Sequence, residues 1–393
     1  MKERQAATCL SVRELCTTSP RLPLPSSAGI TRLLIVVSVA QESSAHRRMK
    51  PGILLLGNVA PPRIIELARL AESVGFGDAW IADERFYREV YSYLSIVAAA
   101  TTRIRLGTCV TDPYSRHPAM TAAAVATLDE ISGGRALLGI GTGLSGLAEM
   151  GIERHRPVLA MREMVDLVRQ LLKGTAVDFK GEVISFQDGR LNFTPLRADI
   201  PVYIASNGPL GLALAGKVAD AAIMEGCGTP REAEVFVGRV RGAAKKAGRD
   251  PATIQCIARL NCCISDDSAA AHNLLRARAA RTLTGFVTPL ATLEEQGLAL
   301  PATAIASMTG IPYKAGLAPY EKLNPLVSNQ MVDAVTLAGT PREVADRISA
   351  LRRCGIDGVI ISPAAVAGDT VDRVIRRFAE EVWPAIDAVR RPS

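Results

Sequence analysis

The chain has few aromatic residues and no long run of hydrophobic ones, and both shortages exclude classes of protein. Aromatic residues make up only 4% of its 393 positions. Its Lys and Arg residues form no stripe interleaved with aromatic side chains, so nucleic-acid binding is not expected. The longest apolar segment near the start, from Leu33 to Ala40, is much shorter than the roughly eighteen residues of a membrane helix. We therefore expect no membrane span.

The cysteine and histidine residues lack the spacing of a metal or disulfide site. None of the eight cysteines forms a C-x-x-C pair, and most lie in apolar runs typical of buried thiols. A zinc site and a disulfide framework are therefore not expected, and a reducing cytoplasm fits best. The four histidines are scattered, and none has a second ligand at metal-binding spacing, so no metal site is expected.

The first 48 residues differ in composition from the rest of the chain. They are rich in Ser, Thr, Pro and Arg and show no helical or strand periodicity. They carry seven basic and three acidic side chains. The resulting net charge of +4 is more than half of the chain's formal net charge of +7. We expect a disordered tail or a start assigned too far upstream. A signal peptide is the alternative, although the charged region before Leu33 is atypically long for one.

From Met49 onward, strand-like and helical segments alternate in eight units. The strand-like segments are Gly52–Leu56, Ala79–Ala82, Ile104–Val110, Ala136–Ile140, Val202–Ala205, Ala221–Met224, Ile254–Ile264 and Gly358–Ile361. Alternation predicts a parallel sheet covered by helices. Eight units favour an α/β fold of the (β/α)8 TIM-barrel type over an open, doubly wound sheet. Residues 49–393 are thus expected to form a single domain.

Two segments interrupt this alternation and are predicted to be insertions. Residues 177–193 read as a hairpin with its turn near Lys180 and Gly181. Residues 279–331 are too long for a bare loop and contain several Gly and Pro residues. We expect this second insertion to contain short helices that form a lid or a subunit contact.

Polar loops follow several predicted strands, at the edge where parallel α/β folds place their chemistry. Asp83 and Glu84 follow the second strand, where they would either exchange protons with a ligand or cap a helix. His117 lies in the loop after the third strand and precedes Pro118. It is either an acid–base group or a helix cap.

Glycine-containing loops follow the fourth and fifth strands. Gly141-Thr142-Gly143 would allow a ligand to approach the backbone closely, but it lacks the G-x-G-x-x-G context of a nicotinamide site. Ser206-Asn207-Gly208 would hold an anion or a ring carbonyl, or would be a simple turn.

The strand-end segments together resemble the luciferase-like monooxygenase superfamily. Within it they are most similar to the F420-dependent branch that includes methylenetetrahydromethanopterin reductase. The segments that carry the resemblance are Trp80–Glu84, Leu106–Pro118, Leu128–Gly143, Ile204–Pro209 and Ala338–Glu343. The resemblance implies a TIM barrel that binds a flavin or deazaflavin at the carboxyl ends of its strands.

The resemblance also implies particular site residues. A non-prolyl cis peptide bond against the cofactor ring would fall at Cys109–Val110. The other implied cofactor contacts are Asp83, Thr142, Gly143, Ser206, Asn207 and Gly208. The cofactor's acidic tail would meet basic rim residues such as Arg85, Arg88 or Arg116.

The chain departs from its relatives at the proton donor. Leu54 stands where some relatives have an acidic residue, and Leu144 stands where others have Glu. Others place His beside the second-strand Asp, where this chain has Glu84. We therefore expect Glu84 to be the donor, with His117 as the second candidate.

These observations predict an oxidoreductase that transfers hydride between coenzyme F420 and a small organic substrate. An FMN-dependent monooxygenase on the same barrel is the alternative. A catalytically inactive barrel that serves as a binding protein is a third possibility. The resemblance further implies a homodimer or a higher homo-oligomer.

Overall fold

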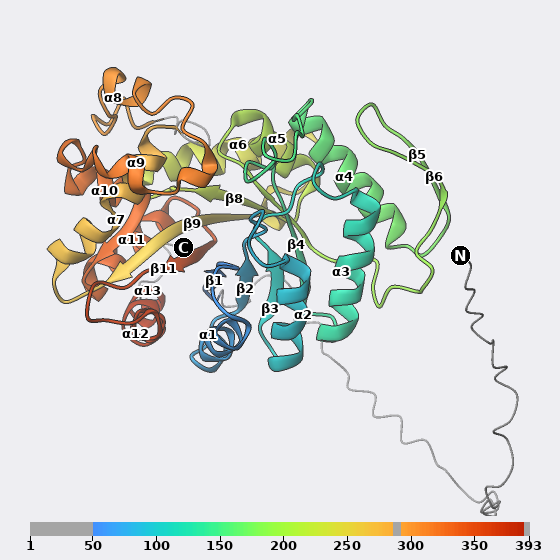
Figure 1. Ribbon diagram of the computed structural model, residues 1–393, viewed down its shortest axis with the longest axis horizontal. Coiled ribbons are helices and arrows are strands. Elements are labelled where there is room, and N and C mark those ends of the chain that lie inside the picture. The colour runs from blue at the N-terminus through green and yellow to red at the C-terminus, as the bar shows by residue number, and fades with distance from the viewer. Residues whose placement is uncertain (1–49, 286–291, 389–393) are drawn as a thin grey trace, which may run out of the picture. The chain divides into compact units, whose positions relative to one another are not determined.

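Eight parallel strands close into a barrel in the computed structural model, which describes residues 50–285 and 292–388 (Figure 1). The predicted tail, residues 1–48, lies outside the described residues. The barrel strands are β1 (Gly52–Leu55), β2 (Asp78–Ile81), β3 (Arg105–Thr108), β4 (Ala136–Ile140), β7 (Val202–Ala205), β8 (Ala221–Glu225), β9 (Gln255–Ile264) and β11 (Gly358–Pro363). These strands correspond to the eight segments predicted from the sequence.

Strand β11 closes the barrel because it pairs on both of its edges. Gly52 of β1 is in register with Ile360, and Leu260 of β9 is in register with Ile361. Strand β8 joins the other edge of β9, where Ala222 is opposite Cys256. Closure confirms the predicted TIM barrel and rules out the open, doubly wound alternative.

Helices surround the barrel, and most of them begin at proline. They are α1 (Pro61–Ser73), α2 (Val90–Ala100), α3 (Pro118–Ser132), α4 (Pro157–Leu171), α5 (Pro209–Val218), α6 (Pro230–Lys246), α11 (Pro341–Arg353), α12 (Val371–Arg377) and α13 (Trp383–Ala388). Proline suits the first turn because its φ is already helical and its missing N–H would have no partner there. None of the helices in the described ranges combines the length and apolar character of a membrane span.

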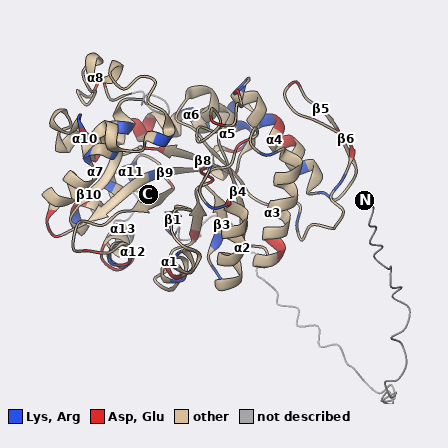
Figure 2. Ribbon diagram, viewed as in Figure 1, with Lys and Arg blue, Asp and Glu red and all other residues tan. Residues whose placement is uncertain are grey.

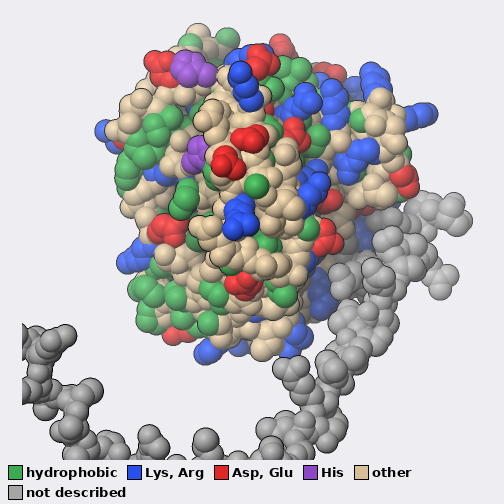
Figure 3. Space-filling view, turned by 90° about the vertical axis from the view of Figure 1, so that its right-hand side faces the viewer, with side chains coloured by type: hydrophobic (Ala, Val, Ile, Leu, Met, Phe, Trp, Pro, Cys, Tyr) green, Lys and Arg blue, Asp and Glu red, His purple; other side chains and the backbone are tan. Residues whose placement is uncertain are grey.

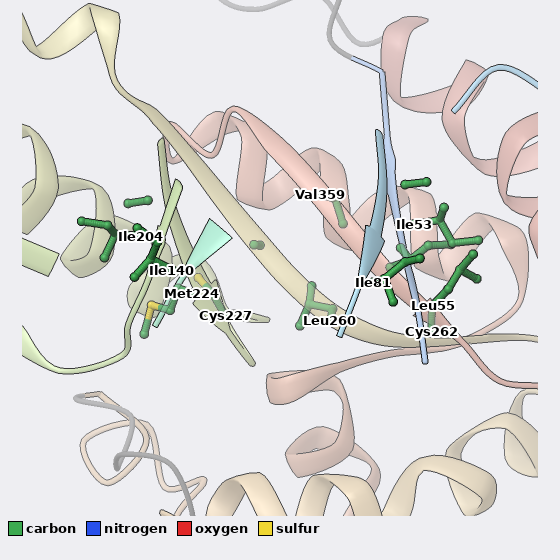
Figure 4. Close-up of a cluster of buried hydrophobic side chains, with 14 of the residues drawn as sticks. Ile53, Leu55, Ile81, Ile140, Ile204, Met224, Cys227, Leu260, Cys262 and Val359 are labelled. Carbon is green, nitrogen blue, oxygen red and sulfur yellow. The ribbon is translucent and has the colours of Figure 1, made fainter. Parts of the chain in front are cut away.

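Side chains alternate between two hydrophobic layers along each strand. Ile53 and Leu55 of β1 face outward with Ile81 of β2, in the layer beneath the helices (Figure 4). Leu54 faces inward, where Trp80 and Tyr203 pack with ring centroids 5.0 Å apart. Each fully buried side chain of this size stabilises the fold by about 1.5–3 kcal/mol. This filled interior supports the loops at the carboxyl ends of the strands.

The first insertion is a hairpin, as its sequence predicts. Strand β5 (Val177–Lys180) pairs antiparallel with β6 (Ser185–Gly189). The carboxylate of Glu163 on α4 accepts backbone hydrogen bonds from Glu182, Val183 and Ile184, at 2.7, 3.0 and 2.8 Å. The hairpin turn is therefore fixed to the barrel helices.

The second insertion contains the short helices α8 (Ala302–Ala306), α9 (Ala318–Glu321) and α10 (Asn329–Val335), whereas residues 286–291 lie outside the described ranges. Two elements near it are absent from the sequence-based prediction. Helix α7 (Ser268–Leu283) runs into the start of the insertion, and strand β10 (Thr336–Gly339) follows the insertion and pairs with the end of β9. Helix α7 buries mainly small alanine side chains, which do not produce a strong apolar periodicity.

Candidate active site

A cavity of about 590 Å³ opens at the carboxyl ends of the barrel strands. This volume is typical of sites for small molecules and cofactors. Leu56, Ala82, Cys109, Ala205 and Glu225, each at or just beyond the end of a different strand, contribute to its wall. Residues of α7 and of the second insertion complete the wall, so the insertion lies beside the site.

Most of the predicted site residues meet in this cavity. Those that line it are Asp83, Glu84, Cys109, Val110, Thr142, Gly143, Ser206 and Asn207. Gly208, Arg116 and His117 lie outside the lining. The Cys109–Val110 peptide bond is cis, as the resemblance implies.

The loop after β4 needs its glycines because neighbouring side chains approach its backbone. A Cβ atom on Gly141 would lie 2.5 Å from Cγ2 of Val110. Gly143 has a φ of +70°, and a Cβ there would lie 3.0 Å from the side chain of Asp112. Both glycines line the cavity, and a side chain at either position would crowd its neighbours.

Asp83 belongs to a buried ion-pair network. Its Oδ1 atom lies 2.7 Å from Nη1 of Arg85, and Arg85 also forms an ion pair with Asp112. Burial lowers the pKa of Arg85, and the charge of Asp83 opposes this shift. Arg85 is therefore neutralised by two carboxylates within the protein, which makes it a poor partner for the acidic tail of a cofactor.

The other predicted contacts for an acidic tail also have internal roles. Arg116 lies 3.3 Å from Asp83 and 2.7 Å from Glu89, and its guanidinium stacks 5.0 Å from the Tyr91 ring centroid. Arg88 is exposed outside the cavity and donates to the carbonyl of Gly57. The geometry thus does not support the prediction that Arg85, Arg88 and Arg116 bind the acidic tail of the cofactor.

Glu84 faces a residue that the sequence analysis missed. The hydroxyl of Tyr313, in the second insertion, donates to Oε1 of Glu84 over 2.6 Å. Burial and the charge of Glu84 raise the pKa of Tyr313, whereas Arg281, 4.9 Å from its ring centroid, lowers it. Glu84 therefore ties the rim of the barrel to the insertion. The only sequence signal for Tyr313 was its place in the predicted lid.

Ser206, Asn207 and Gly208 form the turn between β7 and α5. The Asn207 side chain donates to the carbonyl of Glu225 and accepts from its N–H, at 2.9 and 3.0 Å. It thereby ties the ends of β7 and β8 together. Gly208 is the N-cap residue of α5 and donates its N–H to Oγ of Ser206. Within this turn, Ser206 and Asn207 are the residues that reach the cavity.

His117 caps α3. Its Nδ1 atom accepts from the N–H of Ala119 at 3.1 Å, and its Nε2 atom lies 3.1 Å from the carbonyl oxygen of Ser185. Of the two alternatives raised by the sequence, the geometry favours the cap. His117 therefore stabilises the start of α3, and its side chain does not line the cavity.

Substitutions at His117 separate capping from catalysis. His117→Asn is expected to preserve the cap, whereas His117→Ala should lower the free energy of unfolding by about 1 kcal/mol. Neither variant is expected to change turnover, because the side chain lies outside the cavity. Urea denaturation and steady-state kinetics would check both expectations. A large loss of turnover in the stable Asn variant would return His117 to the list of acid–base candidates.

The fold and the cavity define a TIM-barrel enzyme whose ligands bind at the carboxyl ends of the strands. Residues 35–358 match the family model described as luciferase-like monooxygenase. The chain belongs to this family. The predicted family and the prediction that the chain is an oxidoreductase of this family are thus confirmed.

Similar proteins include archaeal reductases matched over nearly their whole length. The chain is 33% identical to a 5,10-methylenetetrahydromethanopterin reductase of Archaeoglobus fulgidus, over 86% of this chain and 100% of the relative. It is 34% identical to the enzyme of the same name from Methanolobus tindarius, over 81% and 95%.

Two solved structures are also similar to this chain. The coenzyme F420-dependent tetrahydromethanopterin reductase from Methanopyrus kandleri superposes with a TM-score of 0.76 and 30% identity, over 86% of this chain and 100% of that one. An F420-dependent secondary alcohol dehydrogenase superposes with a TM-score of 0.70 over 86% of this chain, at 22% identity. The second comparison supports the fold alone.

Proposed function

We propose that this chain is an F420-dependent oxidoreductase that transfers hydride between the deazaflavin and a small organic substrate. The observation that carries the proposal is the match to the coenzyme F420-dependent reductase from Methanopyrus kandleri, which covers that entire structure with a TM-score of 0.76. By analogy with the archaeal relatives, we propose a reaction of the methylenetetrahydromethanopterin reductase type.

The cavity suits a flat, ring-containing cofactor. Its volume of about 590 Å³ and its glycine-containing wall at Gly141 and Gly143 are compatible with such a ring. We propose that Val110 lies behind the ring and that Thr142 and Ser206 bind its polar edge. When bound, F420 would supply hydride chemistry at its C5 position.

The chain's own contribution would be to orient the substrate, exclude water and move one proton. Tyr313, Lys314, Gly316 and Leu317 of the second insertion line the cavity, and we propose that they cover the substrate. Glu84 is the proposed proton donor. The hydroxyl of Tyr313 holds its Oε1 atom, so we propose that the proton moves from Oε2.

Cofactor capture tests the proposal directly. Titration of the purified protein with F420 and with FMN, followed by fluorescence quenching, is expected to give a Kd for F420 that is lower by about tenfold or more. Gly141→Ala is expected to weaken F420 binding, because its new Cβ would clash with Val110, which lines the cavity. Gly238→Ala is the matched control, since a Cβ there meets nothing within 4 Å.

The other outcomes distinguish the alternatives. Tight FMN binding without F420 binding would favour the FMN-dependent monooxygenase. A folded protein that binds neither cofactor would contradict the proposal and favour the inactive barrel.

A further inference from the structure

Charges are mixed on the surface, whereas three arginine side chains gather on one side of the cavity. Lys and Arg positions are interspersed with Asp and Glu positions along the ribbon (Figure 2), and side chains of both signs lie on the face in Figure 3. On the β2 side of the cavity, Arg85 is bound between Asp83 and Asp112. The side formed by β9 and α7 instead presents the basic cluster, which we define as Arg259, Arg278 and Arg281.

The members of the basic cluster differ in their partners. Arg259 forms an ion pair with Glu225, and Arg281 stacks on Tyr313 with a distance of 4.9 Å to the ring centroid. Within residues 50–285 and 292–388, no carboxylate lies within 4.0 Å of the guanidinium of Arg278, which is half-buried. Arg278 therefore brings into the cavity wall a positive charge that has no ion-pair partner among these residues.

Crowding of like charges makes this arrangement costly without an anion. Burial lowers the pKa of Arg278, and the charges of Arg259 and Arg281 lower it further, whereas the charge of Glu84 opposes the shift. Arg278 and Arg281 are three residues apart on one helix and so share a face, which holds their charges close together. A negatively charged ligand group would relieve both the repulsion and the incomplete solvation.

We propose that Arg278, with Arg259 and Arg281, binds a phosphate or carboxylate group of a ligand in the cavity. Guanidinium groups suit this role because each can donate two parallel hydrogen bonds to such an anion. The inference rests on the proposed function to the extent that the ligand occupies the same cavity. The anion belongs either to the substrate or to the acidic tail of the cofactor.

Pyrophosphate is the probe for this subsite. Calorimetric titration of the full chain is expected to detect binding, which Arg278→Gln should weaken by about tenfold or more, the value of a charge-assisted hydrogen bond. Arg278→Lys, which keeps the charge, should weaken binding less. Arg342→Gln is the matched control because its side chain is 93% exposed on α11. Thermal melts would show whether each variant remains folded.

The same titration in the presence of F420 identifies the source of the anion. If bound F420 blocks pyrophosphate and Arg278→Gln also weakens F420 binding, the anion is the cofactor's tail. If both bind together, the anion belongs to the substrate. Equal pyrophosphate affinity in the wild type and folded Arg278→Gln would overturn the inference even if F420 binds. Arg278-dependent pyrophosphate binding without F420 binding would contradict only the proposed function.

Discussion

Replacing Arg85 with glutamine should lower the free energy of unfolding by about 3–5 kcal/mol, the usual loss when one partner of a buried ion pair is removed. The Arg85 side chain is 11% exposed and forms ion pairs with Asp83 and Asp112, which are 8% and 1% exposed. Glutamine would leave the buried carboxylate of Asp112 without a compensating charge, and Asp83 would keep only Arg116, at 3.3 Å. Urea denaturation, with the free energy extrapolated to water, measures the loss.

Arg88→Gln is the matched control for this prediction. Arg88 lies in the same loop and is exposed, and its Nη1 atom donates to the carbonyl of Gly57 at 3.2 Å. We expect it to change the free energy of unfolding by no more than about 0.5 kcal/mol. A loss at Arg85 as small as that at Arg88 would show that the buried network contributes little. Other contacts would then have to stabilise the loop after β2.

The barrel was predictable because apolar strand segments alternate clearly with helical segments along the sequence. Buried parallel strands such as β4 are continuous apolar runs, and helices such as α11 begin with readable caps. Thr340 accepts from the N–H of Glu343, whose carboxylate in turn accepts from the N–H of Thr340, as that capping pattern requires. Helix α7 has an N-cap at Asp267, but its buried side chains are mainly alanine and give no strong apolar periodicity. Strand β10 begins directly after α10, with no turn residues to mark its start.

The site was only partly predictable because its contacts join distant segments. The strand-end rule brought Glu84, Val110 and Thr142 together, since the carboxyl ends of parallel strands share one edge. It did not indicate which charges would neutralise each other: Arg85 and Asp112 are 27 positions apart. Nor did it reveal the basic cluster, because α7 was not predicted.

Replacing Glu84 with glutamine should lower turnover by about 10²–10⁴-fold, the usual contribution of a general acid or base. The amide has nearly the shape of the carboxylate, and its oxygen can still accept the hydrogen bond from Tyr313. It cannot supply the proton that the proposed hydride transfer requires. F420 affinity should remain almost unchanged. Single-turnover kinetics and a fluorescence titration measure the two quantities separately.

Tyr313→Phe separates proton transfer from positioning. This variant leaves the Glu84 carboxylate in place but removes the hydroxyl that donates to Oε1 over 2.6 Å. We expect turnover to fall by only about tenfold, the value of one hydrogen bond to a charged group. If both variants lost activity equally, Glu84 would act mainly by holding the insertion against the barrel. If Glu84→Gln kept full turnover, Glu84 would have no acid–base role, and the proton would have to come from another group or from water.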